Sequence, residues 1–399
     1  MVVRLKPGKE IPIRAGHPWI FSDALAEDTS GDAGMLVKVF ASDGKPLGQG
    51  TWNGHTSIRV RLLTRDPDEK IDAEFFAKRF QKLDEWKRSR LPIETNGFRL
   101  VHAEADGIPG LIVDRYDSVF VFQLHTAGMD RFRQEIIRAL DETFQPSAIV
   151  ERSDIDVRKM EGLTDQPIAV HQGTVTGPVS FQENGLTFLA DVLHGQKTGF
   201  FLDQRNARIK TGELAKGKRV LNLFGYTGAF SVHAMNGGAS FVTTVDASRS
   251  ALELAQKNFE INKFDPENES RCLFLEANVL DLLQEDRLPN APYDLIVCDP
   301  PAFAKTARHL TAAIKAYTDL NAACLRHLKP GGILVTSSCS GRLDPDDFRS
   351  LLRIASGRAN RDVRLLDWII QPADHAERLA FPEGRYLKTA ILEVTDTLT

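Results

Sequence analysis

The stretch Val220-Leu-Asn-Leu-Phe-Gly-Tyr-Thr-Gly-Ala-Phe-Ser231 decides the fold of the C-terminal half of this chain. Its first residues are apolar, as in a buried strand, and Gly225 and Gly228 then permit a tight turn into a helix. Around and beyond it, apolar runs indicate strands at residues 219–223, 241–245, 272–275, 293–298 and 332–338, and helical patterns lie at 248–258 and 312–328. This alternation predicts an α/β domain built on a doubly wound parallel sheet.

Two smaller domains are predicted in front of this sheet. Alternating runs at residues 35–40 and 56–63, with a turn at Ser42-Asp-Gly-Lys45, indicate short strands. The next part mixes both periods, with amphipathic helices near 72–90 and 129–140 and strands near 110–113, 119–124 and 148–150. The sequence therefore predicts a small β domain (1–72), an α+β middle domain (73–187) and the doubly wound domain (188–399).

The composition argues against several classes of protein. With 399 residues, 42% of them hydrophobic and 26% charged, the chain is typical of a soluble globular protein. The net charge of −4 indicates no general affinity for polyanions, so nucleic-acid binding would need a local basic surface. The four cysteines lack CxxC spacing, which argues against a zinc site, and no apolar stretch approaches the roughly 18 residues of a membrane helix. We expect a cytoplasmic protein without a metal or a membrane partner, and the sequence leaves a homodimer open.

The ends of the first three predicted strands of the sheet carry residues suited to a nucleoside. The turn at Gly225 and Gly228 lets a ligand approach the backbone, Asp246 can accept bonds from a ribose diol, and Asn278 can read an adenine edge. The GxxG spacing differs from the GxGxxG fingerprint, which disfavours a nicotinamide oxidoreductase. The structural alternative is that the glycines only make the turn and that Asp246 only caps the next helix.

A second motif ends the fourth strand, in Tyr293-Asp-Leu-Ile-Val-Cys-Asp-Pro-Pro-Ala-Phe-Ala-Lys305. The two prolines after Asp299 stop the strand and remove backbone donors. The next predicted strand, residues 332–338, runs into Cys339. If the two strands are parallel neighbours, the carboxylate of Asp299 and the thiol of Cys339 converge at one edge of the sheet. Cys298 points to the opposite face from Asp299 and is predicted to lie in the core.

These motifs, in this order, resemble those of class I S-adenosylmethionine-dependent methyltransferases: Leu223-Phe-Gly-Tyr-Thr-Gly-Ala-Phe230, Val245-Asp-Ala-Ser248, Asp299-Pro-Pro-Ala-Phe303 and Ser337-Ser-Cys-Ser340. More narrowly, the chain is similar over nearly its full length to the bacterial large-subunit ribosomal RNA cytosine-C5 methyltransferase I family. The most specific match is Gly195-Gln-Lys-Thr-Gly-Phe-Phe-Leu-Asp-Gln-Arg205. Gly16-His-Pro-Trp-Ile-Phe21 is similar to the opening of the PUA domain of that family, and Ala105-Asp-Gly-Ile-Pro-Gly-Leu-Ile-Val-Asp114 to its middle domain.

The resemblance implies a Rossmann-like catalytic domain behind an RNA-binding PUA domain, with S-adenosyl-L-methionine as the cofactor. The residues that it implies at the cofactor are Phe200, Gln204, Arg205, Phe224, Gly225, Tyr226, Gly228, Asp246, Ala247, Asn278 and Asp299. Asn278 departs from many relatives, which carry Asp there, although an amide oxygen can still accept a bond from the adenine amino group. For Phe200 the structural alternative is that its ring fills the core between domains.

The resemblance further implies 5-methylcytosine in large-subunit (23S) rRNA as the product, with Cys339 and Asp299 as catalytic residues. Cytosine C5 is barely nucleophilic, so a thiolate at Cys339 would first add to C6 of the base. Asp299 would hold the N3 edge of the base and limit the build-up of charge. The structural alternative is that Cys339 is an inert packing residue, as buried cysteines usually are.

A second reaction stays open. The motif Asp299-Pro-Pro-Ala-Phe303 also resembles the Asp-Pro-Pro-Phe/Tyr motif of amino and ring-nitrogen methyltransferases. In those enzymes the carboxylate and a proline carbonyl, here Asp299 and Pro300, accept an exocyclic N–H, and an aromatic ring, here Phe303, stacks on the flipped base. RNA guanine-nitrogen methylation, which needs no thiol, is therefore the alternative activity.

Physical support for RNA as the substrate is local. A basic helix end at Lys87, Arg88 and Arg90 beside the β domain could hold an RNA stem, and Trp19 or Trp52 could stack on a base. The structural alternative for Trp19 is the core of the β domain. A pure RNA-binding scaffold is disfavoured because the set of cofactor motifs is complete.

Overall fold

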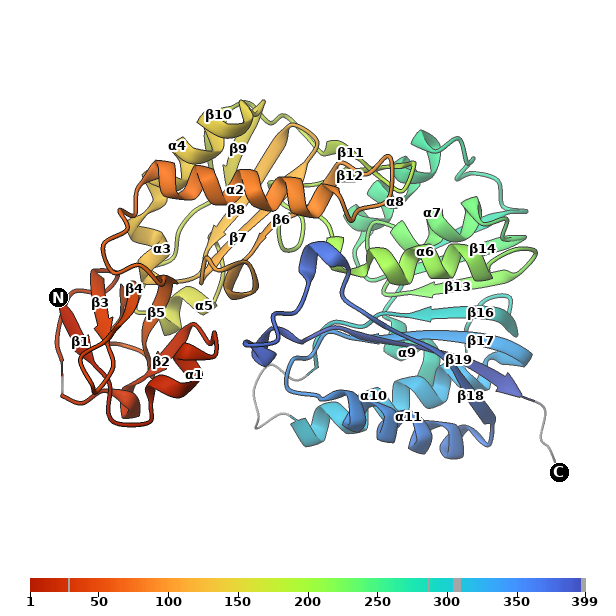
Figure 1. The fold of residues 1–399 in the computed structure, drawn as a ribbon. Helices are drawn as coiled ribbons and strands as arrows, with labels where there is room; N and C mark the ends of the chain where they lie inside the picture. The colour runs from red at the N-terminus through yellow and green to blue at the C-terminus, as the bar shows by residue number, and fades with distance from the viewer. Residues whose placement is uncertain (28, 286, 304–309, 396–399) are drawn as a thin grey trace. The chain divides into compact units, whose positions relative to one another are not determined.

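The computed structural model describes residues 1–27, 29–285, 287–303 and 310–395 (Figure 1). Internal packing divides the chain into two compact units. The first unit comprises Met1–Glu183, Ala190–Leu202 and Ala373–Gly384, and the second comprises Asn184–Leu189, Asp203–Pro372 and the chain from Arg385 onward. The segment Ala373–Gly384 thus belongs to the first unit, although it connects two strands of the second.

The first unit begins with a five-stranded sheet in the order β1-β3-β4-β5-β2. Its elements are β1 (Val2–Arg4), α1 (Glu10–Arg14), β2 (Trp19–Phe21), β3 (Leu36–Phe40), β4 (Pro46–Trp52) and β5 (Ile58–Thr64). The predicted turn joins β3 to β4: Gly44 has a φ of +82°, and the Asp43 carboxylate accepts a hydrogen bond from the backbone N–H of Lys45 (3.1 Å). The alternation in β3 buries Val37 and Val39, as the pattern predicted.

The rest of the first unit contains a second five-stranded sheet, in the order β10-β9-β8-β7-β6. Its elements are α2 (Ala73–Arg88), β6 (Gly97–His102), β7 (Leu111–Tyr116), β8 (Val119–Leu124), α3 (Ala127–Arg131), α4 (Arg133–Phe144), β9 (Ala148–Glu151), α5 (Val157–Met160) and β10 (Ala169–Gly173), followed by β11 (Val179–Glu183). Helix α2 begins as predicted because the Asp72 carboxylate caps it, accepting from the backbone N–H of Phe75 (3.1 Å).

The prediction of a single helix near 129–140 is wrong in one respect. The chain leaves the helical conformation at Phe132, whose buried ring packs 5.6 Å from that of Phe76.

The second unit is built on a seven-stranded sheet in the order β15-β14-β13-β16-β17-β19-β18 (Figure 1). Its elements, with the strand β12 (Leu186–Ala190) that precedes them, are α6 (Arg205–Leu214), β13 (Arg219–Leu223), α7 (Ala229–Asn236), β14 (Phe241–Asp246), α8 (Arg249–Ile261), β15 (Cys272–Glu276), α9 (Val279–Gln284), β16 (Tyr293–Cys298), α10 (Leu310–Arg326), β17 (Leu328–Ser338), α11 (Pro345–Ala359), β18 (Asp362–Ile370) and β19 (Lys388–Thr395). The five predicted strands are confirmed and run parallel as neighbours. The α/β class is therefore confirmed.

One edge of this sheet differs from the prediction. Strands β18 and β19 extend the sheet beyond β17, and β19 is antiparallel to both of its neighbours. The sheet is thus mixed rather than purely parallel, because the chain returns from β18 to β19 without a crossover helix.

The centre of the sheet explains why the run before Asp299 is so apolar. Strand β16 lies between β13 and β17, and nearly all of its residues are buried. A parallel strand covered by helices on both faces has no solvated side, so it reads as a continuous apolar run. Cys298, its last residue, is fully buried in the same cluster as Cys324 of α10, which confirms the prediction that Cys298 is a core residue.

Candidate active site

The register of the central strands brings the predicted motifs to one edge of the sheet (Figure 1). Leu223 of β13 and Thr336 of β17 are both partners of Cys298 in β16, so the three strands end side by side. Asp299 follows Cys298 directly, and Cys339 lies just beyond the end of β17. Strands β16 and β17 are therefore the parallel neighbours that a convergence of Asp299 and Cys339 requires.

The turn between β13 and α7 has an uncommon backbone conformation. Phe224 and Tyr226 have φ angles of +57° and +45°, in the left-handed region, and Gly228 has a φ of +72°. A non-glycine residue costs on the order of 1 kcal/mol or more in this region, and such strain gathers at ligand sites. The backbone N–H of Gly225 donates to the carbonyl of Val245 (2.8 Å), which fixes the turn against β14.

Both glycines of this turn also have a packing role. A Cβ atom at Gly225 would lie 2.6 Å from Cγ2 of Thr244, and one at Gly228 would lie 2.8 Å from Cβ of Ala255. Packing alone is therefore sufficient to explain glycine at both positions. It does not explain the left-handed backbone of Phe224 and Tyr226 beside them.

Asp246 links this turn to the end of β14. One carboxylate oxygen accepts from the backbone N–H of Tyr226 and the other from that of Ser248, each over 2.8 Å. The cap of α8 is Ser248, whose hydroxyl accepts from the backbone N–H of Ala251 (3.3 Å). Asp246 is thus not the cap of that helix. Each of its carboxylate oxygens keeps a lone pair for a further donor.

Asn278 is the N-cap of α9. Its side-chain oxygen accepts from the backbone N–H of Leu280 (2.9 Å), and its amide NH2 group has no hydrogen-bond partner among the residues described. The side chain is exposed, as is that of Ala247 after β14. Because the oxygen already accepts one bond in the cap, the NH2 group is the freer part of Asn278 for a ligand.

Gln204 and Asp299 are joined directly within the second unit. The side-chain amide of Gln204 donates to the Asp299 carboxylate over 2.7 Å. Gln204 is 3% exposed, and its amide oxygen is buried without a hydrogen-bond partner in the described part of the chain. A buried acceptor left without a donor costs about 1–3 kcal/mol, so a ligand that donates here would be favoured.

Arg205 and Phe200, which come from the same segment, belong to different units. Arg205 is the first residue of α6, in the second unit, and is 1% exposed. Phe200 belongs to the first unit, where its ring meets that of Phe181 edge-on with centroids 4.9 Å apart. The closure of this segment over the cofactor stays a prediction.

The residues after Asp299 form an aromatic contact with α10. Pro300 is buried and Phe303 is partly exposed. The ring of Phe303 lies 4.7 Å from that of Tyr317, at an interplanar angle of 52°. A ring supported in this way at the sheet edge can stack on a planar base. Ala304 and Lys305, which end the quoted motif, lie outside the described residues.

Cys339 differs from the other thiols. It is partly exposed, whereas Cys272, Cys298 and Cys324 are buried. The pKa of Cys298 is raised well above its ordinary value, first by a hydrogen bond with the Cys324 thiol and then by burial. Cys298 therefore stays protonated.

A buried lysine beside Cys339 was missed from the sequence. Lys388 begins β19 opposite Ser338, and its ammonium donates to the backbone carbonyls of Ser340 (2.7 Å) and Tyr386 (3.0 Å). Burial lowers the pKa of Lys388 to about 8. The only signal in the sequence is a lysine at the start of an apolar run, and its place opposite Ser338 depends on a pairing that the sequence does not reveal.

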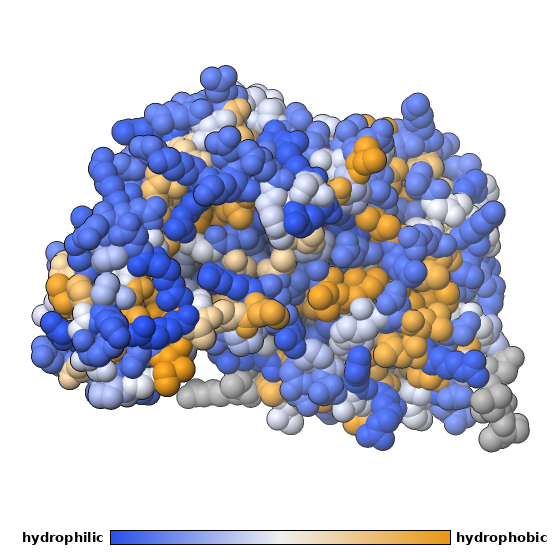
Figure 2. All heavy atoms as spheres, in the orientation of Figure 1, coloured by the Kyte–Doolittle hydropathy of each residue, from blue (hydrophilic) through white to orange (hydrophobic). Residues whose placement is uncertain are grey.

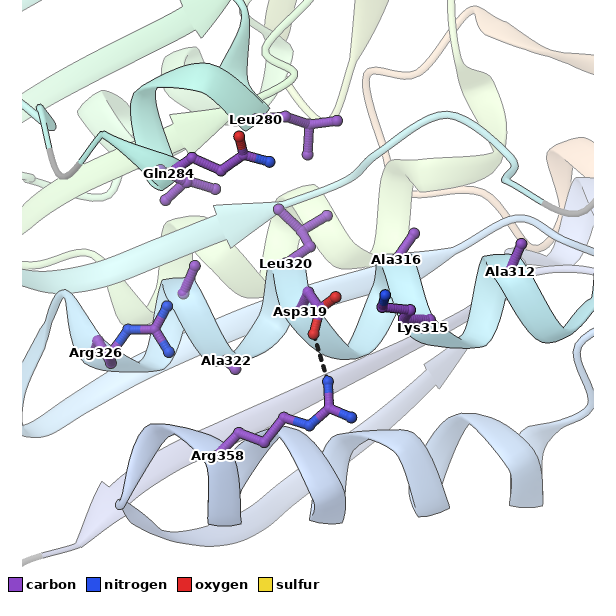
Figure 3. Close-up of a pocket in the computed structure, with 12 residues that line it drawn as sticks. Leu280, Gln284, Ala312, Lys315, Ala316, Asp319, Leu320, Ala322, Arg326 and Arg358 are labelled. Carbon is purple, nitrogen blue, oxygen red and sulfur yellow. Dashed lines mark hydrogen bonds and ion pairs between the residues drawn. The ribbon is translucent and has the colours of Figure 1, made fainter.

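A cavity of about 620 Å³ lies along the helices outside the sheet (Figure 3). Its walls come from α9, α10 and Arg358 of α11, which forms an ion pair with Asp319. None of the predicted site residues lines it. The cavity is therefore separate from the residues gathered at the strand ends.

The predicted basic helix end is partly wrong. Lys87 is 1% exposed, and its ammonium bonds the Asp106 carboxylate and the carbonyl of Asp374, so it stabilises the first unit rather than meeting solvent. Arg88 forms an ion pair with Asp84 (2.8 Å).

No helix of the described residues is long and apolar enough to span a membrane, and the face in Figure 2 is mainly hydrophilic.

The tryptophans differ in their surroundings. Trp52 is 1% exposed and belongs to the core of the N-terminal sheet. Trp19 is half-buried; its indole N–H donates to the Glu104 carboxylate (2.9 Å), and its ring lies 4.7 Å from that of Phe381. Trp52 is therefore not available to a base.

Three guanidinium groups of the first unit form an arginine cluster (Arg65, Arg79 and Arg378). Burial, and also the charge of Arg378, lowers the pKa of both Arg65 and Arg79; for Arg79 the charge of Glu69 acts in the opposite direction. Arg378 is therefore close enough to both of the other guanidinium groups to repel them. Such a cluster suits an anion with several oxygens, for example a phosphate backbone.

Comparison with families of known proteins gives two matches. The sequence profile of S-adenosylmethionine-dependent methyltransferases matches residues 159–373, and that of PUA-like domains matches residues 3–65. The chain is 40% identical over 395 residues to the ribosomal RNA large subunit methyltransferase I of Shewanella denitrificans, covering 98% of this chain and 99% of the relative. It is 39% identical over 396 residues to the protein of the same name from Aeromonas salmonicida, covering 98% of each.

Solved structures agree with this fold over the whole chain. A protein from Streptococcus mutans, classed as an S-adenosylmethionine-dependent methyltransferase, matches with a TM-score of 0.82 at 24% identity, covering 99% of this chain and 100% of that one. A protein classed as a methyltransferase, solved in complex with S-adenosylhomocysteine, matches with a TM-score of 0.83 at 25% identity, covering 99% of each chain.

Proposed function

The chain belongs to the ribosomal RNA large subunit methyltransferase I family of S-adenosylmethionine-dependent methyltransferases, and from this premise we propose that it methylates C5 of a cytosine in large-subunit rRNA through a covalent thiol, Cys339. The observation that carries the proposal is the position of Cys339. Cys339 follows β17, and Asp299 follows the neighbouring strand β16. All four cysteines are described, and Cys339 is the one among them that is not buried.

S-adenosyl-L-methionine is the cofactor of this family, and the ends of β13 and β14 fit it. The strained residues Phe224 and Tyr226 present backbone to a ligand, and Asp246 can accept from a ribose hydroxyl. The unpartnered amide oxygen of Gln204 suits the ammonium of the amino-acid part. The bound cofactor supplies an electrophilic methyl group on a sulfonium.

The adenine contact is proposed in a modified form. Because the oxygen of Asn278 caps α9, its NH2 group would donate to an acceptor nitrogen of the adenine ring. This differs from the expected contact through the amide oxygen. A family member with Asp at this position could only accept a bond, so the two residues would read different atoms of the same ring.

The thiol makes the carbon nucleophilic. The Cys339 thiolate adds to C6 of the base, and the electron pair of the C5=C6 bond moves to C5, which then attacks the methyl group. A base removes the proton from C5, the C–S bond breaks, and the double bond and the thiolate are restored. Asp299 holds the N3 edge of the base, and Phe303, supported by Tyr317, stacks on it.

Guanine-nitrogen methylation is the second candidate, because Asp299, Pro300 and Phe303 could hold an amino group without any thiol. The two reactions separate in one experiment. Unmodified 23S rRNA is incubated with methyl-labelled S-adenosylmethionine and either the wild type or Cys339→Ala, and the labelled nucleosides are identified by mass spectrometry. We expect 5-methylcytidine from the wild type only. A methylated guanosine, made equally well by Cys339→Ala, would establish the second candidate.

RNA binding is assigned to the first unit. The arginine cluster lies there, and the PUA-like match at residues 3–65 extends to Arg65, which directly follows β5. Since large-subunit rRNA is made and assembled in the cytoplasm of bacteria, we expect the protein there.

A further inference from the structure

Lys388 is a buried ammonium group at the edge where the reaction is proposed. It lies in the sheet between β17 and β18, directly opposite Ser338, and is 3% exposed. Two of its three protons are held by the carbonyl oxygens of Ser340 and Tyr386. The residue before Ser340 is Cys339, so the hydrogen bond to the Ser340 carbonyl holds the ammonium next to the backbone of Cys339.

This cation has no carboxylate partner of its own. Among the described residues no Asp or Glu lies within ion-pair distance of Lys388, and Asp344 acts on it only at longer range. Burying an unpaired charge is costly, and neutral carbonyl groups offset only part of that cost. A negative charge on Cys339 would compensate the ammonium. The charge of Cys339 has a larger effect on Lys388 than the charge of Asp344 has.

The other titratable groups around Lys388 do not supply that charge. The hydroxyl of Tyr317, on α10, lies 3.1 Å from the Ser340 hydroxyl, and burial raises its pKa, so it stays neutral. The Asp203 carboxylate accepts a hydrogen bond from the hydroxyl of Tyr386 (2.8 Å), and the charges that act on Lys388 are those of Cys339 and, more weakly, Asp344. Of the two acids that act on Lys388, Cys339 has the larger effect.

We propose that Lys388 is a positioning residue for the reaction: its ammonium holds Cys339 as the thiolate that attacks the base, an inference that rests on the function proposed above. Nearby Lys lowers the pKa of a cysteine and so raises the fraction of reactive thiolate at neutral pH. The effect is mutual, since burial lowers the pKa of Lys388 and the thiolate raises it, and the pKa lies at about 8. Near neutral pH the pair can therefore exist as thiolate and ammonium.

The first test uses the wild-type protein without RNA or cofactor. The rate of alkylation of Cys339 by iodoacetamide is followed from about pH 5.5 to 9.5 by peptide mass mapping, which separates Cys339 from the three buried thiols. We expect a midpoint at least one unit below the ordinary cysteine pKa of about 8.5. A midpoint at or above that value would overturn the proposal, and this measurement does not depend on any variant folding.

The second test asks whether Lys388 is the cause. In Lys388→Met the midpoint should rise by a unit or more, so alkylation at pH 7 slows about tenfold, whereas Lys388→Arg should stay near the wild type. The matched control is Lys329→Met, which removes a lysine paired with Asp294 at the other end of β17 and should leave the midpoint unchanged. An unchanged midpoint in Lys388→Met would overturn the proposal. Rescue by Arg is a result that a packing role would not give.

The two proposals fail in different ways. If Cys339→Ala methylates as well as the wild type, the covalent mechanism is wrong, and the catalytic use of Lys388 falls with it even if the low midpoint is found. If Cys339→Ala is inactive but the wild-type midpoint is ordinary, the mechanism stands and the role of Lys388 alone is wrong.

Discussion

The side-chain amide of Gln204 donates a hydrogen bond of 2.7 Å to the carboxylate of Asp299, a residue 95 positions away in the chain. The bond fixes one oxygen of Asp299 and orients the amide of Gln204. It also leaves the buried oxygen of Gln204 as an acceptor for a ligand. The segment with the most specific family resemblance is thus tied to the residue proposed to hold the base.

Gln204→Met should weaken cofactor binding. The variant keeps the volume of the side chain but removes both the donor to Asp299 and the unpartnered acceptor. We expect the affinity for S-adenosylhomocysteine to fall about tenfold, or about 1.4 kcal/mol, in isothermal titration calorimetry. The exposed Gln81 on α2 provides the control, and Gln81→Met should bind as the wild type does. Unchanged binding by Gln204→Met would remove Gln204 from the site.

Asp246→Asn should disturb the turn that receives the cofactor. Two backbone N–H groups, of Tyr226 and Ser248, point at the two oxygens of Asp246, so an NH2 group in place of one oxygen would face a donor. We expect at least a tenfold loss of affinity for S-adenosylhomocysteine, since a buried donor left unpaired costs about 1–3 kcal/mol. Glu253→Gln, on the exposed side of α8, is the isosteric control. Equal affinities in both variants would contradict this role of Asp246.

The arginine cluster should carry part of the RNA affinity. Removing Arg65 or Arg378 by substitution with Ala should weaken binding of rRNA fragments of any sequence several-fold. Each change should also lower the slope of log affinity against log salt by about 0.7–0.9, as expected for one lost phosphate contact. Filter binding at several salt concentrations measures both. Arg88→Ala, whose guanidinium is already paired with Asp84, should change neither, and equal slopes for all variants would place the RNA elsewhere.

His125 should make the first unit less stable in acid. Burial first, and then the charges of Arg99 and Arg158, lowers the pKa of His125 from 6.5 to about 4. The unfolded chain therefore binds a proton that the folded chain does not between these two pH values, so stability falls as the pH drops from 6.5 towards 4. Between pH 6.5 and 4, we expect the free energy of unfolding in urea of the first unit to fall by about 1–2 kcal/mol less in His125→Gln than in the wild type. The exposed His194, replaced by Gln, should keep the full dependence; identical profiles for the two variants would contradict the assignment.

Local patterns were enough to find the sheet and its motifs. The apolar run of β16 and the Gly225 turn follow from periodicity and from residues that stop or bend a strand. The ends of β13, β16 and β17 then meet because parallel neighbours end at the same edge. This is why the amino-acid sequence alone relates Asp299 to Cys339.

Contacts between residues far apart in the sequence could not be predicted from local patterns. Lys388 and Ser340 are brought together by the antiparallel pairing of β17 with β19, and no local pattern announces it. Lys87 looked like a basic helix end, but a loop from far along the chain, at Asp374, buries it. The break at Phe132 arises from packing on Phe76 rather than from a helix-breaking residue.

Covalent trapping tests the central claim most directly. A large-subunit rRNA fragment made with 5-fluorocytidine is incubated with the protein and S-adenosylmethionine, and products are separated under denaturing conditions. Fluorine at C5 cannot leave as a proton, so the bond between Cys339 and C6 should persist after methyl transfer. We predict a stable protein–RNA adduct with the wild type and with Cys272→Ser, whose thiol is buried, and none with Cys339→Ala. An adduct with Cys339→Ala, or none with the wild type while methylation proceeds, would contradict the account.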